Sequence, residues 1–95
     1  MSKIEKHKEI CEILTTIYEQ KNNDYGDSFA KSFKEYGLTM SCIRIEDKLN
    51  RAKALSRGTK QMVNDESILD TFYDMANYAI LTIIELENDQ RTSSK

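Results

Sequence analysis

The chain has 95 residues, of which 39% are hydrophobic and 32% are charged, with no proline, three glycines and a formal net charge of −2. This composition favours a single all-α domain over a turn-rich β fold. The small net charge gives no overall field that would attract duplex nucleic acid or an anionic membrane, and no apolar run approaches the ~20 residues that cross a bilayer. We therefore expect a cytoplasmic protein with no duplex nucleic acid and no membrane as partner.

The first half of the chain predicts a long helix followed by a short one. Apolar residues recur at helical spacing over residues 2–22, and residues 21–28 are rich in Asn, Asp and Gly, which favour turns. Asp27 or Ser28 is expected to cap the short helix. That helix should end at Gly37, because glycine readily takes the left-handed conformation common at helix ends.

The second half predicts two further long helices. One runs from about residue 39 to Arg57, and the other begins at about Asp65 after a loop over residues 58–65. The inward face of the first of these helices is expected to hold Cys42, Ile45, Leu49 and Ala52. Both cysteines, Cys11 and Cys42, are expected to be buried, reduced thiols.

The last helix has the most regular apolar pattern of the chain. Six residues recur at spacings of three and four, so one side of the helix can face a core: Leu69, Phe72, Ala76, Ala79, Ile83 and Leu86. Beyond Asn77 the helix is apolar nearly all round, which predicts a surface for a second copy. The expected fold class is all-α, a compact bundle of three long helices plus one short helix, assembled as a homo-oligomer. Residues 1–87 are expected to form one domain and residues 88–95 a flexible tail.

Three carboxylates of the last helix lie along one line at intervals of four: Glu66, Asp70 and Asp74. Like charges at this spacing cost about 0.2–0.5 kcal/mol per pair unless a cation lies nearby. Two interpretations stay open. The carboxylates can hold Mg²⁺ beside a substrate phosphate, or they pair with basic residues of the preceding helix, Arg44, Lys48 and Arg51.

A nucleotide site is predicted from two other groups of residues. The segment after the first helix combines a cation, polar groups that can contact a base or sugar, and a ring that can stack on a base. The alternative is a plain turn between two helices. The basic residues of the third predicted helix suit phosphate binding, with a solvated, salt-bridged surface as the alternative. The predicted ligand-binding set is Lys21, Asn23, Asp24, Tyr25, Arg44, Lys48, Arg51 and Asn77.

Three ordered blocks of the sequence resemble a known family. They are Lys-Asn-Asn-Asp-Tyr-Gly-Asp-Ser-Phe at 21–29, Arg-Ile-Glu-Asp-Lys-Leu-Asn-Arg at 44–51, and Asp-Glu-Ser-Ile-Leu-Asp-Thr-Phe-Tyr-Asp-Met-Ala-Asn-Tyr-Ala at 65–79. Together they resemble the nucleotide modification associated domain 1 family, a small helical domain of phages and phage-like genes, over residues 10–86. The resemblance implies a role with nucleotides in a phage context, in the cytoplasm of the bacterial host cell, and supplies no particular reaction.

A looser similarity is to the all-α nucleotide pyrophosphatases of the MazG and dimeric dUTPase type. Those enzymes typically bind Mg²⁺ through a Glu-x-x-Glu motif on one helix and a Glu-x-x-Asp motif on the next. Here Glu46 and Asp47 are followed by Lys48, so the chain departs from that pattern.

Several functions agree with these residues, and whether the protein is an enzyme stays open with them. The first is binding of a phosphorylated nucleotide, with or without action on it in nucleotide metabolism or modification. The second is a non-catalytic oligomeric sponge that sequesters a nucleotide second messenger of host anti-phage defence, linear or cyclic. The third is a Mg²⁺-dependent nucleotide pyrophosphohydrolase, and the last is a purely structural interaction module.

Overall fold

The protein is an all-α chain of four helices in its computed structural model, which describes residues 2–25, 27–57 and 65–93. For residues 24, 25, 65, 66 and 90–93 only the backbone is described. The helices are α1 (Lys3–Tyr25), α2 (Ser28–Tyr36), α3 (Leu38–Arg57) and α4 (Asp65–Ser93), and the described part contains no strand. The predicted fold class of three long helices and one short one is confirmed. None of the helices in the described ranges has the length and apolar character needed to cross a membrane.

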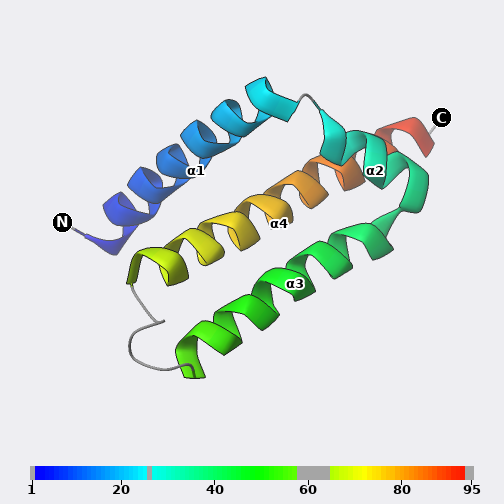
Figure 1. Ribbon diagram of the computed structural model, residues 1–95. Coiled ribbons are helices and arrows are strands. Elements are labelled where there is room, and N and C mark those ends of the chain that lie inside the picture. The colour runs from blue at the N-terminus through cyan, green and yellow to red at the C-terminus, as the bar shows by residue number, and fades with distance from the viewer. Residues whose placement is uncertain (1, 26, 58–64, 94–95) are drawn as a thin grey trace.

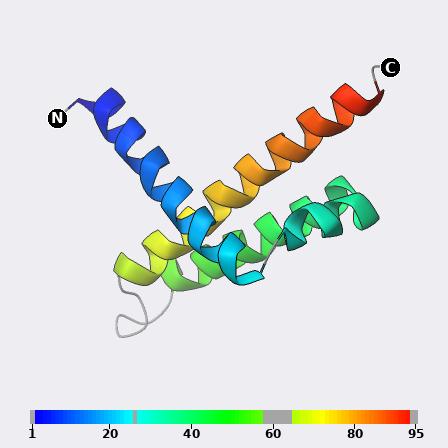
Figure 2. The same cartoon turned by 90° about the horizontal axis from the view of Figure 1, so that it is seen from above.

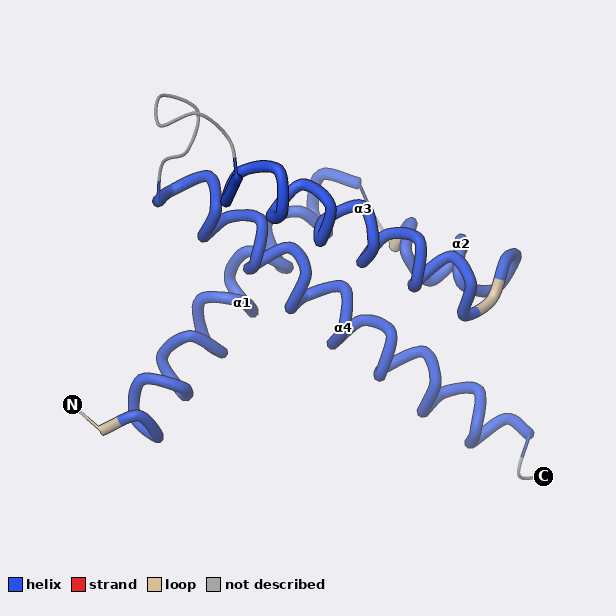
Figure 3. The backbone as a smooth tube through the Cα atoms, turned by 90° about the horizontal axis from the view of Figure 1, so that it is seen from below, coloured by secondary structure: helices blue, strands red, loops and turns tan. Residues whose placement is uncertain are grey.

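The helices α3 and α4 form an antiparallel hairpin and make the most extensive contact in the chain (Figure 1). The short α2 precedes α3 (Figure 1) and contacts α4 near its middle, where the Phe29 ring of α2 lies 6.0 Å from the Tyr78 ring of α4. Figures 2 and 3 show that α1 crosses α4 near its middle, so that the first half of α1 and the second half of α4 diverge like the arms of a V.

The first helix is longer at its carboxyl end than the sequence predicts. It begins with a capping box, in which the Ser2 hydroxyl accepts a hydrogen bond from the Glu5 N–H (3.1 Å) and the Glu5 carboxylate accepts one from the Ser2 N–H (2.9 Å). It continues to Tyr25, so the expected turn does not start at residue 21. The weak preference of Asn and Asp for turns is overridden by tertiary contacts, among them the bond from Lys21 to Asp74 of α4.

The second helix is bounded as predicted. Asp27 occupies the N-cap position, although its side chain makes no capping hydrogen bond. At the other end Gly37 has φ 74° and ψ −160°, a conformation that is essentially restricted to glycine. Its N–H donates to the Phe33 carbonyl (2.7 Å), which closes the helix.

The buried residues of α3 and α4 are mostly small. Among the described residues they are Met40, Ser41 and Ala52 of α3, and Thr71 and Thr82 of α4. Small side chains let two helices approach closely. The predicted inward face of α3 is confirmed at Ala52, which is buried, and wrong at Cys42 and Leu49, because Ser41 is buried beside the exposed Cys42 and Leu49 is 41% exposed. Cys11 is exposed as well, so the expected burial of both thiols is wrong.

The apolar side of α4 that was expected to face a core faces away from α3. Leu69, Phe72 and Ile83 are each more than half exposed within the single chain. A helix that is apolar nearly all round can dock by either side, and here the side that carries Thr71 and Thr82 faces α3. The expected surface for a second copy in the other half of α4 stays a prediction.

The last helix also extends further than expected. It reaches Ser93 and includes most of the predicted tail. The flexibility of residues 88–95 and the domain boundary at residue 87 stay predictions. The expected loop before α4 lies outside the described residues.

Candidate functional site

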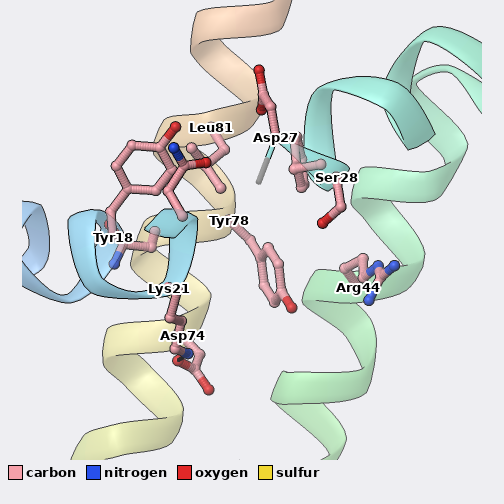
Figure 4. A pocket seen from close by; sticks show the side chains of 11 residues that line it. Tyr18, Lys21, Asp27, Ser28, Arg44, Asp74, Tyr78 and Leu81 are labelled. Carbon is pink, nitrogen blue, oxygen red and sulfur yellow. Dashed lines mark hydrogen bonds and ion pairs between the residues drawn. The ribbon is translucent and has the colours of Figure 1, made fainter. Parts of the chain in front are cut away.

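A cavity of about 340 Å³ lies where α1 crosses α4 and where α2 and α3 come closest to that crossing (Figure 4). This is within the range of ligand pockets, roughly 300–1,000 Å³. All four helices and the N-cap of α2 contribute to its lining: Tyr18, Lys21, Asn22, Asp27, Ser28, Phe29, Arg44, Asp74, Asn77, Tyr78 and Leu81. The cavity therefore exists only because residues far apart in the sequence are brought together.

One carboxylate, Asp74 of α4, joins two lysines at the edge of this cavity. The Lys21 ammonium lies 2.8 Å from Asp74 Oδ1, and the Lys48 ammonium lies 3.0 Å from Asp74 Oδ2. Burial alone would raise the pKa of the Asp74 carboxyl, but the hydrogen bonds and charges of the two lysines outweigh burial and hold that pKa below its ordinary value. Asp74 is therefore ionised at neutral pH and links α1, α3 and α4.

A third cation, Arg44, lines the same cavity from α3. Arg44 lies one turn before Lys48 on α3, and within the described part of the chain its guanidinium forms no ion pair. In Figure 4 the Tyr78 side chain extends into the space between α4 and α3, and the Arg44 side chain lies over α3 across from it. An Arg fork in this position is suited to bind an anion through two parallel hydrogen bonds.

Aromatic rings form another wall of the cavity. The rings of Phe29 and Tyr78 lie 6.0 Å apart at an angle of 26°, and the rings of Phe29 and Phe33 lie 6.4 Å apart at 23°. These distances are typical of offset aromatic pairs. Phe33 is buried and its ring lies against that of Phe29. The parts of the Phe29 and Tyr78 rings that line the cavity give it an aromatic surface for a planar ligand.

Asn77 has a role in the fold besides its place in the cavity lining. Its side-chain amide donates a hydrogen bond to the Leu14 carbonyl of α1 (3.1 Å). This bond connects α1 and α4 at their crossing, next to the Lys21–Asp74 pair. The predicted ligand contact of Asn77 is compatible with this bond, since the amide oxygen faces no donor in the described residues.

The structure brings together some of the predicted ligand-binding residues and leaves others apart. Lys21, Arg44 and Asn77 line the cavity, and Lys48 is joined to it through Asp74. Two predicted residues, Arg51 and Asn23, are exposed and lie outside the cavity lining, and the side chains of Asp24 and Tyr25 lie outside the described residues.

The aromatic wall is the part of the site that the predicted set of residues lacks. Phe29 and Tyr78 occupy positions that look like core positions in the sequence. The sequence gives one indication of their role, because Phe29 lies in the block at 21–29 and Tyr78 in the block at 65–79, two of the blocks that resemble the family. It does not indicate that these two rings contact each other.

The predicted metal site is only partly covered by the described residues. Asp70 is exposed, each oxygen of Asp74 accepts from a lysine, and the Glu66 side chain lies outside the described residues. Among the side chains that are described, no group of three or more His, Cys, Asp or Glu could hold a metal ion. The pairing of Asp74 with Lys48, one of the two interpretations of the carboxylates, is observed. Mg²⁺ binding stays a prediction, and at Asp74 the ion would have to displace an ammonium group.

The fold and the site together define a small all-α domain with a cavity that is lined by basic and acidic side chains and by aromatic rings. The sequence model of the nucleotide modification associated domain 1 family matches residues 21–86, and the chain belongs to this family. The matched segment contains every cavity-lining residue except Tyr18. No curated protein and no solved structure matches the chain. The looser similarity to MazG-type pyrophosphatases has no support in these comparisons.

Proposed function

We propose that this protein binds a phosphorylated nucleotide in the cavity between its four helices. The observation that carries the proposal is the meeting of three cationic side chains, Lys21, Lys48 and Arg44, with a stacked aromatic pair. The name of the family, which refers to nucleotide modification, supports the same class of ligand.

The phosphate is assigned to the cationic side of the cavity. Arg44 supplies a planar fork whose geometry matches phosphate oxygens. Lys21 and Lys48 both pair with the Asp74 carboxylate, and Arg44 adds a positive charge that forms no ion pair within the described residues. An ammonium has three N–H donors, and a phosphate oxygen can accept from the donors of Lys48 that Asp74 does not use.

The base is assigned to the wall formed by Phe29 and Tyr78. Stacking of a base on an aromatic side chain contributes about 1–3 kcal/mol and tolerates different bases. Polar groups at the cavity entrance, Asn22 and Ser28, can contact base edges or the sugar. Contacts from Asn23, Asp24 and Tyr25 stay predictions.

Titration calorimetry against a panel of nucleotides tests this proposal. The panel contains the four ribonucleoside monophosphates, their triphosphates, the parent nucleosides and cyclic dinucleotides. Arg44→Ala should lower the affinity for the nucleotide at least tenfold, because a charged donor to the phosphate is lost. Nucleosides, which have no phosphate, should bind the wild type more weakly than nucleotides do. Arg51→Ala, two turns further along α3 and outside the cavity lining, is the matched control. Absence of binding across the panel, or equal losses in both variants, would contradict the proposal.

Sequestration of the ligand is the second candidate, and one observation favours it over hydrolysis. Both oxygens of Asp74 accept hydrogen bonds from lysines, so this carboxylate is poorly placed to bind a metal or to deprotonate water. In a phage context the ligand of such a sponge would be a nucleotide second messenger of host defence.

Recovery of the ligand distinguishes the two outcomes. The protein is incubated with its best ligand and Mg²⁺ and then denatured by heat, and the small molecules are identified by mass spectrometry. Sequestration predicts that the intact nucleotide is recovered. Release of phosphate or pyrophosphate would favour the pyrophosphohydrolase, and in that case Asp70→Ala should abolish the release.

A further inference from the structure

The side of α4 that faces away from α3 carries a regular apolar row. The row alternates spacings of three and four over two and a half heptads, which is the pattern of a coiled-coil contact. We call it the α4 seam: Leu69, Phe72, Ala76, Ala79, Ile83 and Leu86. All but the half-buried Ala76 are exposed in the single chain.

The exposed surface of the whole chain is large for its mass. It amounts to 7545 Å² at 11.0 kDa, whereas a compact monomer of this mass exposes about 5,600 Å². The radius of gyration is 15.4 Å, against about 12 Å for a compact domain of this length. The excess is about 1,900 Å², and a standard protein interface covers roughly 800 Å² per partner. The chain therefore has enough surplus surface for a stable interface.

The order of side chains along the seam identifies the partner. From either end, the seam has two large residues, then two alanines, then two large residues, so its order of side-chain sizes is the same in both directions. We propose that a second copy of this chain covers the seam, with the two α4 helices antiparallel across a two-fold axis between Ala76 and Ala79. This register sets Leu69 against Leu86 of the partner subunit and Phe72 against Ile83 of the partner subunit.

The register satisfies what a two-fold interface requires. Such an interface uses the same patch on both subunits, so the patch must be complementary to itself. Here large side chains oppose large ones at both ends, and the alanines meet at the centre, where they allow the helices to approach closely. A parallel arrangement would place each residue against its own copy, including Phe72 against Phe72.

The seam lies on another side of α4 than the cavity. At 100° per residue, the cavity residues Asp74, Tyr78 and Leu81 lie on the side of α4 opposite the seam. The Asn77 contact with α1 lies on that same side. Dimerisation through the seam therefore leaves the cavity accessible, and this proposal does not depend on nucleotide binding.

Sedimentation velocity of the full chain without ligand tests the dimer. The wild type should sediment as a dimer or as an even-numbered assembly of dimers, and Phe72→Glu should weaken self-association at least tenfold, because two charges enter an apolar contact. Ile43→Glu is the matched control, since Ile43 of α3 is 52% exposed and Phe72 is 51% exposed. A monomeric wild type, or equal effects of the two substitutions, would overturn the proposal.

A charge-pair variant tests the antiparallel register. Ile83→Lys alone should also weaken the dimer, whereas the double variant F72E/I83K should restore it, because each introduced carboxylate faces an introduced ammonium of the other copy. In a parallel pair, like charges would meet instead. Failure of the double variant to associate, with its helical circular dichroism retained, would overturn the register. Recovery also shows that the single variants lose association and not the ability to fold.

Discussion

A single carboxylate, Asp74, organises the charged residues of the cavity. It lies on the side of α4 that faces α1 and α3, and both of its oxygens are used by lysines from those helices. Without this carboxylate, the two ammonium groups beside it would repel each other. The residue therefore contributes to the fold and to the cavity at once.

Removing this charge should affect stability in a pH-dependent manner. Asp74→Asn should lower the free energy of unfolding at pH 7 by about 1 kcal/mol. Because the pKa of Asp74 is lower in the folded state than its ordinary value, its contribution is present above that ordinary value and is lost as the pH falls through the folded-state pKa. Urea unfolding of wild type and variant should thus converge in acid.

The matched control is Asp70→Asn, one turn earlier on α4. The Asp70 side chain is exposed and forms no ion pair with the described residues, so this change should leave the free energy of unfolding nearly unaltered. A loss equal to that of Asp74→Asn would contradict the role assigned to the lysine pairs.

At the level of elements, α1 is the least firmly attached helix. It meets α4 mainly at their crossing, where Leu14 is buried, Asn77 donates to the Leu14 carbonyl and Lys21 pairs with Asp74. The first half of α1 extends away from the other helices (Figure 2). A few contacts at one crossing thus hold a helix of 23 residues.

Loss of the amide bond at the crossing should loosen α1 selectively. Asn77→Ala removes one hydrogen bond, worth about 1 kcal/mol, so the amides of α1 should exchange with deuterium faster while those of α3 change little. Hydrogen exchange with mass spectrometry measures this directly. Asn50→Ala on the exposed side of α3 is the control, and equal acceleration in both variants would contradict the assignment.

At the level of the whole molecule, the single chain buries few apolar side chains. Among the described residues only four apolar side chains are buried: Leu14, Phe33, Met40 and Ala52. Small domains gain little stability from so limited a core. If the α4 seam is covered by a second copy, folding and association are coupled.

Coupling of this kind predicts a concentration-dependent melting temperature. The Tm of the wild type should rise as the protein concentration is increased over two orders of magnitude, because mass action favours the dimer. In Phe72→Glu the Tm should be lower and should depend less on concentration. Differential scanning calorimetry at several concentrations checks this, and a constant wild-type Tm would contradict it.

The helices were predictable because their signals are local. Apolar spacing, the turn residues and the positive φ at Gly37 depend on neighbours in the sequence. The side by which α4 docks on α3 was not predictable, because apolar residues cover most of its circumference. The observed side is the one that allows ion pairs between distant residues, such as Lys48 with Asp74. The sequence alone does not specify which of the possible pairs forms.

The site was predictable for its charges and much less for its shape. Arg44 and Lys48 are one helical turn apart, so their shared face follows from spacing alone. The meeting of Phe29 with Tyr78 depends on how α2 lies against α4. Rings at apolar positions are usually core residues, and only the tertiary arrangement shows that these two also line a cavity.

The shared carboxylate of Lys21 and Lys48 has a further consequence, which concerns entropy. A free lysine side chain loses about 1.5–2 kcal/mol of rotamer freedom when it is fixed. Both ammonium groups are already held by Asp74 before an anion arrives, so most of that loss belongs to folding and not to binding. In the proposed function, Asp74 thus preorganises the two lysines for an incoming phosphate.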